Sequence, residues 1–452
     1  MANSGKPQAW QVRSALPGAA WPAIPPSDRA AVLALLFQLE QSQWLTGEQL
    51  RERQREQLTV LLRHARDTVP YYQSRWPTQR AARLEELPIL ARRELQEHFE
   101  ALKSEQIPSA HGPATESRTS GATGAPVRVL RTQLGQLFWS ALTLREHLWH
   151  ERDFAAKLAV IRQGVRAGET DNWGPATAGL VATGPCVMLT PASSVAEQLE
   201  WLGRQRPAYL LTYPSNVVEL ASLALAQGVR LEGLREVRTI GESLGAETRA
   251  LCLEAWGAPL TDFYSTQEVG YVALQCPGNE HYHVQAESVL VEVLDEQDRP
   301  CAPGRVGRVV VTDLHNFAMP LIRYELGDYA EGGEPCACGR GLPVLRRILG
   351  RVRNSLVTAD GNRYWPTFGV RGFLDIAPVL QHQFVQKSFE LVEARLVVAS
   401  PLDADQEKRL AERIASRLPP GFRVRIAYRD RIPRSAGGKY EDFYSEVSAA
   451  AR

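Results

Sequence analysis

TDFYSTQEVGYVALQCPGNEHYH, residues 261–283, is the stretch around which the rest of the chain is organised. It packs acidic, aromatic and metal-binding side chains closely together, and neither a helical nor a strand periodicity explains that density. Two interpretations meet in it. One is a nucleotide and Mg²⁺ site around Tyr264 and Glu268, and the other is half of a metal site around Cys276 and His283. The remainder of the chain must supply the missing half of each.

The composition is that of an ordinary globular protein. Of its residues, 44% are hydrophobic and 23% are charged. A chain of 452 residues is too long for one core, so about two or three domains are expected. The balance of 52 basic to 51 acidic residues leaves no electrostatic footprint for nucleic acid or for an anionic membrane. The sequence begins without a signal-peptide pattern, and no stretch approaches the ~18 apolar residues of a membrane span. We therefore expect a cytoplasmic protein with no nucleic-acid or membrane partner.

Alternating strand and helix patterns in the middle of the chain predict an α/β fold with a largely parallel, helix-covered sheet. The predicted strands 209–212 and 236–240 end in the loops Tyr213-Pro214-Ser215 and Gly241-Glu242-Ser243, and Ser215 is expected to cap the helix that follows. Ligands bind at the carboxyl ends of parallel strands. The sequence therefore predicts a binding site at these loops.

The two ends of the chain have different patterns. Residues 1–45 are interpreted as an N-terminal arm, and a helix is expected after it because Thr46 and Gln49 have the spacing of a capping box. After His283 the pattern is β-rich. The last ~90 residues, with two strands around one helix, predict a small α+β domain.

A glycine-rich loop, RTSGATGAP at 118–126, precedes a predicted strand. Gly121 and Gly124 permit the backbone angles of an anion-binding nest, and the hydroxyls of Thr119, Ser120 and Thr123 add donors for phosphate oxygens. Taken alone, the composition of the loop favours a polar turn over a phosphate-binding loop.

Four cysteine and histidine residues have spacings suited to a metal. Cys276 and His283 lie close together, and Cys336 and Cys338 follow after a long interval. Three thiolates and one imidazole form a closed, tetrahedral zinc site of the structural kind. His281 fits the spacing as well as His283 does, and a chance grouping is the competing interpretation. If present, the metal holds the β-rich segment at about 276–340 together.

Several motifs then occur in a fixed order over about residues 45–447: RTSGATGAP, TYPSNVVELA, IGESLG, DFYSTQEVG, PLIRYELGD, LGRVRN and IPRSAGGKYEDF. Together they resemble the successive motifs of the adenylate-forming enzymes, the superfamily of acyl- and aryl-CoA synthetases. The Cys/His set and the ELPIL–ELQEHF segment resemble its phenylacetate–CoA ligase branch. The resemblance implies a large AMP-binding domain at 1–349 and a small mobile lid domain at 350–452 that carries the catalytic lysine.

The resemblance also implies a reaction and residue roles. A carboxylic acid attacks ATP to give an acyl-adenylate and pyrophosphate, and coenzyme A then displaces AMP. Glu268 is expected to bind Mg²⁺, Tyr264 to stack on adenine, Asp328 to accept the ribose hydroxyls, and Lys439 to bridge the carboxylate and the α-phosphate. The other implied nucleotide-binding residues are Thr119, Ser120, Gly121, Thr123, Gly124, Gly241, Glu242, Asp262, Ser265, Thr266 and Arg351.

A small, aromatic or otherwise apolar acid is the expected substrate. Its pocket is expected to be lined by Phe138, Trp139, Tyr213, Pro214, Ser215 and Ile240.

Three departures from the family pattern leave alternatives open. Ala125 stands where the phosphate loop usually carries a lysine, Ser265 replaces a glycine, and Arg353-Asn354 stand where the hinge usually has an acidic residue. The acyl acceptor is therefore coenzyme A, a carrier-protein thiol or an amine. An inactive, zinc-pinned scaffold is the alternative from another class, and a homodimer is left open.

Overall fold

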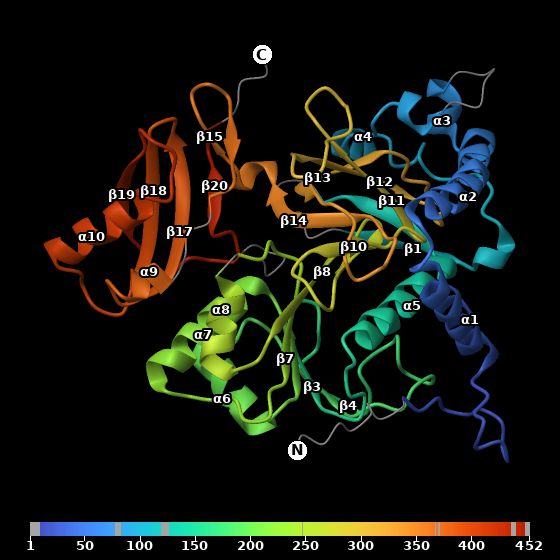
Figure 1. Cartoon of the computed structure of the whole chain (residues 1–452), viewed down its shortest axis with the longest axis horizontal. Coiled ribbons are helices and arrows are strands. Elements are labelled where there is room, and N and C mark those ends of the chain that lie inside the picture. Colours follow the sequence, from blue (N-terminus) through green and yellow to red (C-terminus); the bar gives the residue numbers. More distant parts are fainter. Residues whose placement is uncertain are drawn as a thin grey trace. The chain divides into compact units, whose positions relative to one another are not determined.

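The computed structural model of the protein describes residues 10–76, 83–118, 126–245, 247–366, 368, 371–434 and 440–447. The chain divides into two compact units, whose course is drawn in Figure 1. Unit 1 comprises Met1–Leu158, Gly168–Val187 and Asp262–Ile348, and unit 2 comprises Ala159–Ala167, Met188–Thr261 and Leu349–Arg452. The predicted boundary between a large and a small domain near residue 349 stays a prediction.

The helices of unit 1 begin where the sequence provides caps. Thr46 accepts the Gln49 backbone N–H at 3.2 Å and donates its own N–H to the Gln49 side chain at 2.9 Å, so the predicted capping box is confirmed. A helix over Ser27–Ser42, inside the region expected to be a loose arm, was not predicted. The helices are α1 (Ser27–Ser42), α2 (Gly47–Thr68), α3 (Pro70–Arg75), η1 (Leu84–Glu86), α4 (Arg92–Glu97), η2 (Ser109–His111) and α5 (Gln133–Trp149).

The strands of unit 1 form an antiparallel arrangement in the order β11-β12-β13-β14-β10-β9-β8. Their bounds are β8 (Leu260–Thr266), β9 (Gly270–Gln275), β10 (Tyr282–Val284), β11 (Val289–Leu294), β12 (Val306–Asp313), β13 (Tyr324–Gly332) and β14 (Val344–Arg351). A separate antiparallel pair is formed by β1 (Ala114–Arg118) and β2 (Arg128–Thr132), so the residues that precede the glycine-rich loop are a strand.

The core of unit 1 packs α2, α3 and α4 against these strands. Leu61, Tyr72 and Tyr324 are buried in it, and the Tyr72 hydroxyl donates to the Pro320 carbonyl at 2.9 Å. Because the Tyr72 hydroxyl has an acceptor, burial of this large aromatic side chain stabilises the fold without leaving that donor unpaired. Tyr264 of β8 and Val272 and Ala273 of β9 belong to the same core, which therefore holds these two strands in place.

Unit 2 contains a parallel α/β segment. The strands β6 (Tyr209–Thr212) and β7 (Glu236–Ile240) pair in parallel, as predicted, with β3 (Leu158–Ile161) next to β6. Its helices are α6 (Val195–Gln205), α7 (Pro214–Gln227) and α8 (Thr248–Trp256), seen in green in Figure 1. The short strand β4 (Gly168–Thr170) belongs to unit 1, and β5 (Cys186–Leu189) begins in unit 1 and ends in unit 2.

The predicted cap of α7 is wrong. The helix begins at Pro214 with Tyr213 as its N-cap residue, and Ser215 lies inside the first turn. Proline at the first helical position needs no hydrogen-bond acceptor and has its φ already set for the helix. This gain outweighs the serine cap that the sequence suggested.

The C-terminal part of unit 2 is the predicted α+β module. Its sheet has the order β19-β18-β17-β20, and Figure 1 shows α9 and α10 beside these strands. Leu410 and Ile414 of α10 are fully buried against Phe384 and Leu396 of the sheet. The elements are η3 (Val352–Asn354), β15 (Leu356–Val357), β16 (Arg363–Tyr364), α9 (Arg371–Leu374), β17 (Val379–Ser388), β18 (Leu391–Val398), α10 (Ala404–Ala415), β19 (Arg423–Tyr428) and β20 (Phe443–Ser445).

Within the described residues, no helix combines the length and apolar character needed to cross a membrane.

Candidate functional site

Two residues assigned to the nucleoside lie together in unit 1. Tyr264 of β8 donates its hydroxyl to Asp328 Oδ2 of β13 at 2.6 Å, although the residues are 64 positions apart. Gly327, immediately before Asp328, has φ of +79°, a conformation that favours glycine and lets β13 turn the carboxylate toward the tyrosine. The geometry therefore joins the predicted adenine-stacking and ribose-binding residues in one contact.

Glu268 is the second carboxylate of this region. Its side chain is 8% exposed, and its Oε1 lies 3.3 Å from Arg92 Nη1 at the start of α4. Arg131 of β2 donates to the Val269 carbonyl at 3.4 Å, and a Cβ on Gly270 would lie 2.8 Å from its Nη2. Two guanidinium groups thus border the Glu268 turn. Sequence reasoning missed both, because a single arginine carries no local signal of its partner.

Other predicted nucleotide residues of unit 1 have structural hydrogen bonds. Asp262 accepts from the Tyr282 hydroxyl at 2.7 Å, and its backbone N–H donates to Gln275 Oε1 at 2.8 Å. Thr266 Oγ1 accepts the Val269 N–H at 3.2 Å. Ser265 lies at a register shift between β8 and β9. These contacts shape the turn that carries Glu268.

The glycine-rich loop and the lysine lie outside the described residues. This applies to Thr119, Ser120, Gly121, Thr123 and Gly124, and to Lys439, whose roles stay predictions.

At the base of the loop, Glu116 pairs with Arg128 at 2.7 Å and with Arg118 at 2.8 Å. The Arg128 hydrogen bond, followed by that of Arg118, lowers the pKa of Glu116 to about 2. This one carboxylate therefore pairs with both arginines that border the loop and offsets one of their two positive charges.

The predicted residues of unit 2 gather at the ends of β6 and β7. The Ser215 N–H donates to Glu242 Oε2 at 3.0 Å, and burial raises the pKa of Glu242. Tyr213 accepts the Gln163 N–H on its hydroxyl at 3.0 Å. Pro214 starts α7, Ile240 ends β7, and Gly241 has φ of +81°. The expected meeting of the two loops at one sheet edge is thus observed.

Two predicted pocket residues of unit 1 lie in aromatic pairs. Phe138 stacks on His315 with ring centroids 4.0 Å apart, and Trp139 stacks on Tyr271 at 4.4 Å. Both are on α5, and both are half-buried. Burial raises the pKa of Glu441. The nearby positive charges of Arg353 and then of Arg351, which ends β14 in unit 2, offset part of this rise.

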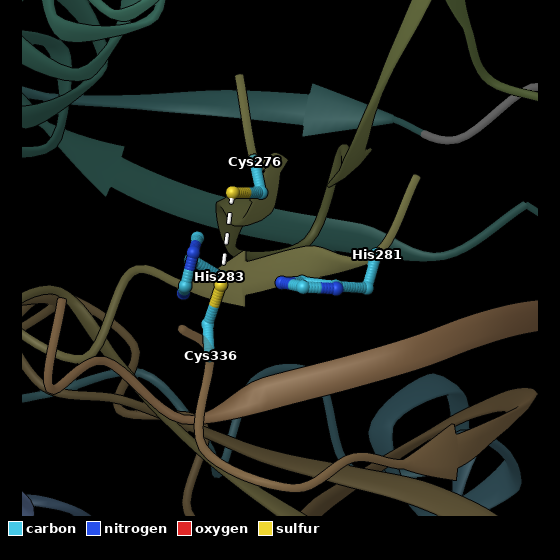
Figure 2. A group of neighbouring side chains, drawn as sticks. All are labelled: Cys276, His281, His283 and Cys336. Atoms are coloured by element: carbon cyan, nitrogen blue, oxygen red, sulfur yellow. Dashed lines mark hydrogen bonds between the residues drawn. The ribbon is translucent and has the colours of Figure 1, made fainter. Parts of the chain in front are cut away.

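The candidate metal ligands converge in unit 1. Ligand atoms of Cys276, His281, His283 and Cys336 all lie within 4.8 Å of one another. Figure 2 shows the two cysteine sulfurs pointing toward each other, with both imidazole rings close to them. Cys276 follows β9, His283 is on β10, and Cys336 comes from the segment between β13 and β14. Residues far apart in sequence are therefore brought to one point.

The separations match the edges of a zinc tetrahedron. Cys276 Sγ and Cys336 Sγ are 3.8 Å apart, and Cys338 Sγ lies 3.4 Å from His283 Nε2. Zn–S bonds of ~2.3 Å and Zn–N bonds of ~2.05 Å give edges of about 3.8 Å between two sulfurs and about 3.6 Å between sulfur and nitrogen. The sulfur–sulfur distance is also far longer than the ~2.05 Å of a disulfide, and all three cysteines are free.

Three N–H contacts point at the sulfurs of Cys276 and Cys336. Asn279 Nδ2 donates to Cys276 Sγ at 3.6 Å and to Cys336 Sγ at 3.7 Å, and the Cys338 N–H donates to Cys336 Sγ at 3.3 Å. Without a cation, burial raises the pKa of Cys336 to about 11. The donors then face neutral thiols, which accept hydrogen bonds weakly.

Each of the two imidazoles has one buried ring nitrogen without a hydrogen-bond partner among the described residues, Nε2 in His281 and Nδ1 in His283. Burial, with a smaller effect from His281, lowers the pKa of His283 to about 4, so it is available as a neutral ligand. His281 Nε2 is buried without a hydrogen-bond partner. The geometry brings Cys276, His281, His283 and Cys336 together and places the Cys338 sulfur beside His283, and the choice between His281 and His283 stays open.

Comparisons with known proteins show which proteins the chain is similar to. Residues 368–445 match the family described as the CapK C-terminal domain. The chain is 26% identical over 443 residues to the phenylacetate–coenzyme A ligase of Thermus thermophilus, which covers 87% of this chain and 96% of the relative. It is 24% identical over 339 residues to the phenylacetate–coenzyme A ligase of Pseudomonas putida, covering 69% and 73% of the two chains.

A solved structure shares the fold. The crystal structure of 2-hydroxyisobutyryl-CoA ligase, in the postadenylation state with 2-HIB-AMP, aligns with a TM-score of 0.68 at 19% identity and covers 86% of this chain and 88% of that one. The expected α/β fold class is thereby confirmed. The chain is thus a relative of the phenylacetate–CoA ligases and has the fold of the adenylate-forming ligases.

Proposed function

We propose that this protein activates a small carboxylic acid with ATP, releasing pyrophosphate and forming an acyl-adenylate, and then transfers the acyl group to coenzyme A. The observation that carries the proposal is the 2.6 Å hydrogen bond between Tyr264 and Asp328. Two motif residues, assigned to the same nucleoside from the resemblance, meet across 64 positions of sequence. The similarity to a phenylacetate–coenzyme A ligase over 96% of that relative supports the same reaction.

Asp328 and Tyr264 would hold the nucleoside. A carboxylate can accept both ribose hydroxyls, and the tyrosine hydroxyl at 2.6 Å fixes its orientation. Tyr264 is 9% exposed, so its ring offers an edge or face of limited area for adenine. In the proposed role, the tyrosine both contacts the base and orients the carboxylate.

Glu268 would hold Mg²⁺. Its buried carboxylate is an oxygen ligand of the kind that this ion prefers, and it already has a cationic neighbour in Arg92. Mg²⁺ at this position would neutralise triphosphate charge and stabilise the charge that develops during adenylation. Arg92 lies where it can share the phosphate charge, and Lys439 is proposed to bridge the acid carboxylate and the α-phosphate, as the resemblance implies.

The substrate is proposed to be an aromatic or otherwise apolar acid. The support comes from the name of the relatives and from the aromatic residues Phe138 and Trp139 on α5. Specificity depends on pocket shape, where one methylene changes binding by only ~1–3 kcal/mol. A substrate panel, rather than geometry, must therefore identify the acid.

A structural Zn²⁺ is proposed for the cluster of Cys276, Cys336, Cys338 and one of the two histidines. Its support is the fit of the 3.8 Å and 3.4 Å separations to a tetrahedron, and the partnerless His281 nitrogen. Four protein ligands would leave no open position. The ion would therefore stabilise the fold around β9, β10 and β14 and take no part in the reaction.

One experiment tests the reaction. Acid-dependent exchange of pyrophosphate into ATP should occur with a preferred acid from a panel of aryl, alkyl and amino acids. It should be lost in Lys439→Ala and Glu268→Gln. Full exchange in both variants would refute the assigned roles. No exchange with any acid would favour the inactive scaffold.

Adding coenzyme A, an amine or a carrier protein identifies the acceptor. Thioester formation with coenzyme A is the expected result. Adenylate formation without a coenzyme A thioester would assign the second step to one of the other acceptors.

A further inference from the structure

Arg131, the next-to-last residue of β2, reaches the start of β9 within unit 1. A Cβ on Gly270 would lie 2.8 Å from its Nη2 and 3.2 Å from its Nη1, and a Cβ on Gly135 would lie 3.5 Å from its Nε. Gly270 also has φ of +83°, a conformation that side chains rarely adopt. The chain therefore leaves room for this guanidinium group at the position where β9 begins.

The guanidinium group holds the turn that carries Glu268. Arg131 Nη2 donates to the Val269 carbonyl at 3.4 Å. The N–H of the same residue donates to Thr266 Oγ1 at 3.2 Å, and Thr266 is paired with Gly270 across the turn. Both backbone groups of Val269 are thus bound, one from inside the turn and one from β2. Because Glu268 immediately precedes Val269, the direction of its buried carboxylate depends on these two contacts.

A buried carboxylate supplies the opposite charge. Asp313, the last residue of β12, is 5% exposed, and burial raises its pKa to about 6. The positive charge of Arg131 is the largest effect that opposes this rise, followed by the backbone N–H groups of His315 and Asn316. A buried carboxylate favours a nearby cation over water-exposed alternatives. Asp313 therefore favours the observed position of the guanidinium group.

The segment after Asp313 supports the same strand. Asn316 Nδ2 donates to the Leu130 carbonyl, one residue before Arg131, at 2.9 Å. His315 stacks on Phe138 of α5 with ring centroids 4.0 Å apart. The end of β12 therefore fixes the backbone of β2 as well as the charge of Arg131. This support is more than a single arginine–carbonyl contact at an exposed turn would have.

We propose that Arg131 is a positioning residue, which holds the turn at Val269 so that the Glu268 carboxylate is oriented for Mg²⁺, with Asp313 as its counter-charge. The inference rests on the proposed function, in which Glu268 is the Mg²⁺ ligand. Arg92 contacts the Glu268 carboxylate directly and is the cation proposed for the phosphates. Arg131 acts through Glu268 instead. The two arginines should therefore affect different steps of nucleotide binding.

Calorimetric titration with ATP, first with Mn²⁺ in place of Mg²⁺ and then in EDTA, separates these steps. Arg131→Met should raise the Kd of Mn²⁺–ATP by about tenfold, as is typical for loss of a group that orients a metal ligand. The Kd of metal-free ATP should stay nearly constant. Arg131→Lys keeps the charge and a donor and should recover part of the affinity. Arg346→Met, on an exposed arginine of β14, is the control and should bind both forms like the wild type.

A double-mutant cycle tests whether Arg131 acts through Glu268. Glu268→Gln should remove the gain in ATP affinity that Mn²⁺ provides, and adding Arg131→Met should then cost nothing further. Additive losses would overturn the positioning role, as would equal losses for Mn²⁺–ATP and metal-free ATP, which indicate a direct phosphate contact. If Arg131→Met does not fold, because Asp313 is left buried without its cation, Arg131→Met combined with Asp313→Asn takes its place.

Hydrogen exchange tests the turn without any nucleotide. The Val269 amide, bound to Thr266 Oγ1, should exchange at least about fivefold faster in Arg131→Met, because release of the Val269 carbonyl loosens the turn. Unchanged exchange in this variant would overturn the inference, as would an unchanged Kd of Mn²⁺–ATP. Failure of the wild type to bind ATP in either form would instead overturn the proposed function, and the exchange experiment would still decide whether Arg131 holds the turn.

Discussion

Replacing Cys276 by serine tests the metal centre at the ligand that follows β9. Cys276 Sγ lies 3.8 Å from Cys336 Sγ, 60 residues later in the chain. Serine is a poor zinc ligand beside thiolates, so the variant should lose the metal. It should also lose the tie between β9 and the segment before β14.

The size of the effect follows from the loop that the metal closes. For a cross-link that closes 60 residues, the chain-entropy relation gives about 4 kcal/mol at 25 °C. Paired strands already restrict the ends of this loop, because His283 of β10 pairs with Val344 of β14. The expected loss of stability is therefore at most about 4 kcal/mol.

Metal analysis and thermal denaturation measure the two consequences. The purified wild type should contain one zinc per chain, and a chelator should lower its Tm. Cys276→Ser should contain none and should be insensitive to the chelator. Cys252→Ser is the matched control, because Cys252 is equally buried and its thiol contacts only the Ala258 carbonyl among the hydrogen bonds described.

The result that refutes the metal assignment is equal zinc content in the wild type and in Cys276→Ser. In that case the adenylation proposal survives, since Tyr264, Asp328 and Glu268 are not among the ligands. If Cys276→Ser does lose zinc, comparison of His281→Ala with His283→Ala decides the fourth ligand, because only replacement of the true ligand should reduce the zinc content.

Three further predictions address the site and the fold. Tyr264→Phe removes the 2.6 Å hydrogen bond to Asp328 and should weaken ATP binding by about tenfold in a calorimetric titration, with Tm nearly unchanged. Arg92→Ala should weaken binding of Mg²⁺-free ATP, whereas Arg93→Ala, whose exposed guanidinium pairs with Glu97, should not; equal effects would exclude Arg92 from the phosphate site. Burial lowers the pKa of His382 to about 4, below its ordinary value of about 6.5. As the pH falls, the histidine of the unfolded chain is therefore protonated first, and the folded state loses about 3 kcal/mol of stability between pH ~6.5 and ~4. In His382→Phe that part of the pH dependence should vanish from urea unfolding measured across this range, and an unchanged slope would contradict the assignment.

Local signals determined the elements that sequence reasoning predicted well. The capping box at Thr46 and the strands β6 and β7 were predicted with their observed start or bounds. Caps and alternating patterns act between residues a few positions apart, so the sequence contains them directly. The order of the motifs, which indicated the enzyme class, is likewise a property of the sequence.

Local signals were misleading where a competing residue was stronger or a partner was distant. Pro214, and not Ser215, determined where α7 begins. Residues 114–118 form a strand because β2 supplies their partners, although they have no strand pattern of their own. In both cases the outcome depended on an interaction that the pattern did not include.

The sequence alone determined which residue types are available: the Cys/His set, the carboxylates Glu268 and Asp328, and Lys439 in a glycine-flanked motif. Tertiary structure decided their partners. It joined Tyr264 to Asp328, placed Arg92 beside Glu268, brought His281 as well as His283 to the cysteines, and bound Arg131 to the Val269 carbonyl. Such contacts join residues tens to hundreds of positions apart, and their energies depend on distance and burial, which only the folded chain defines.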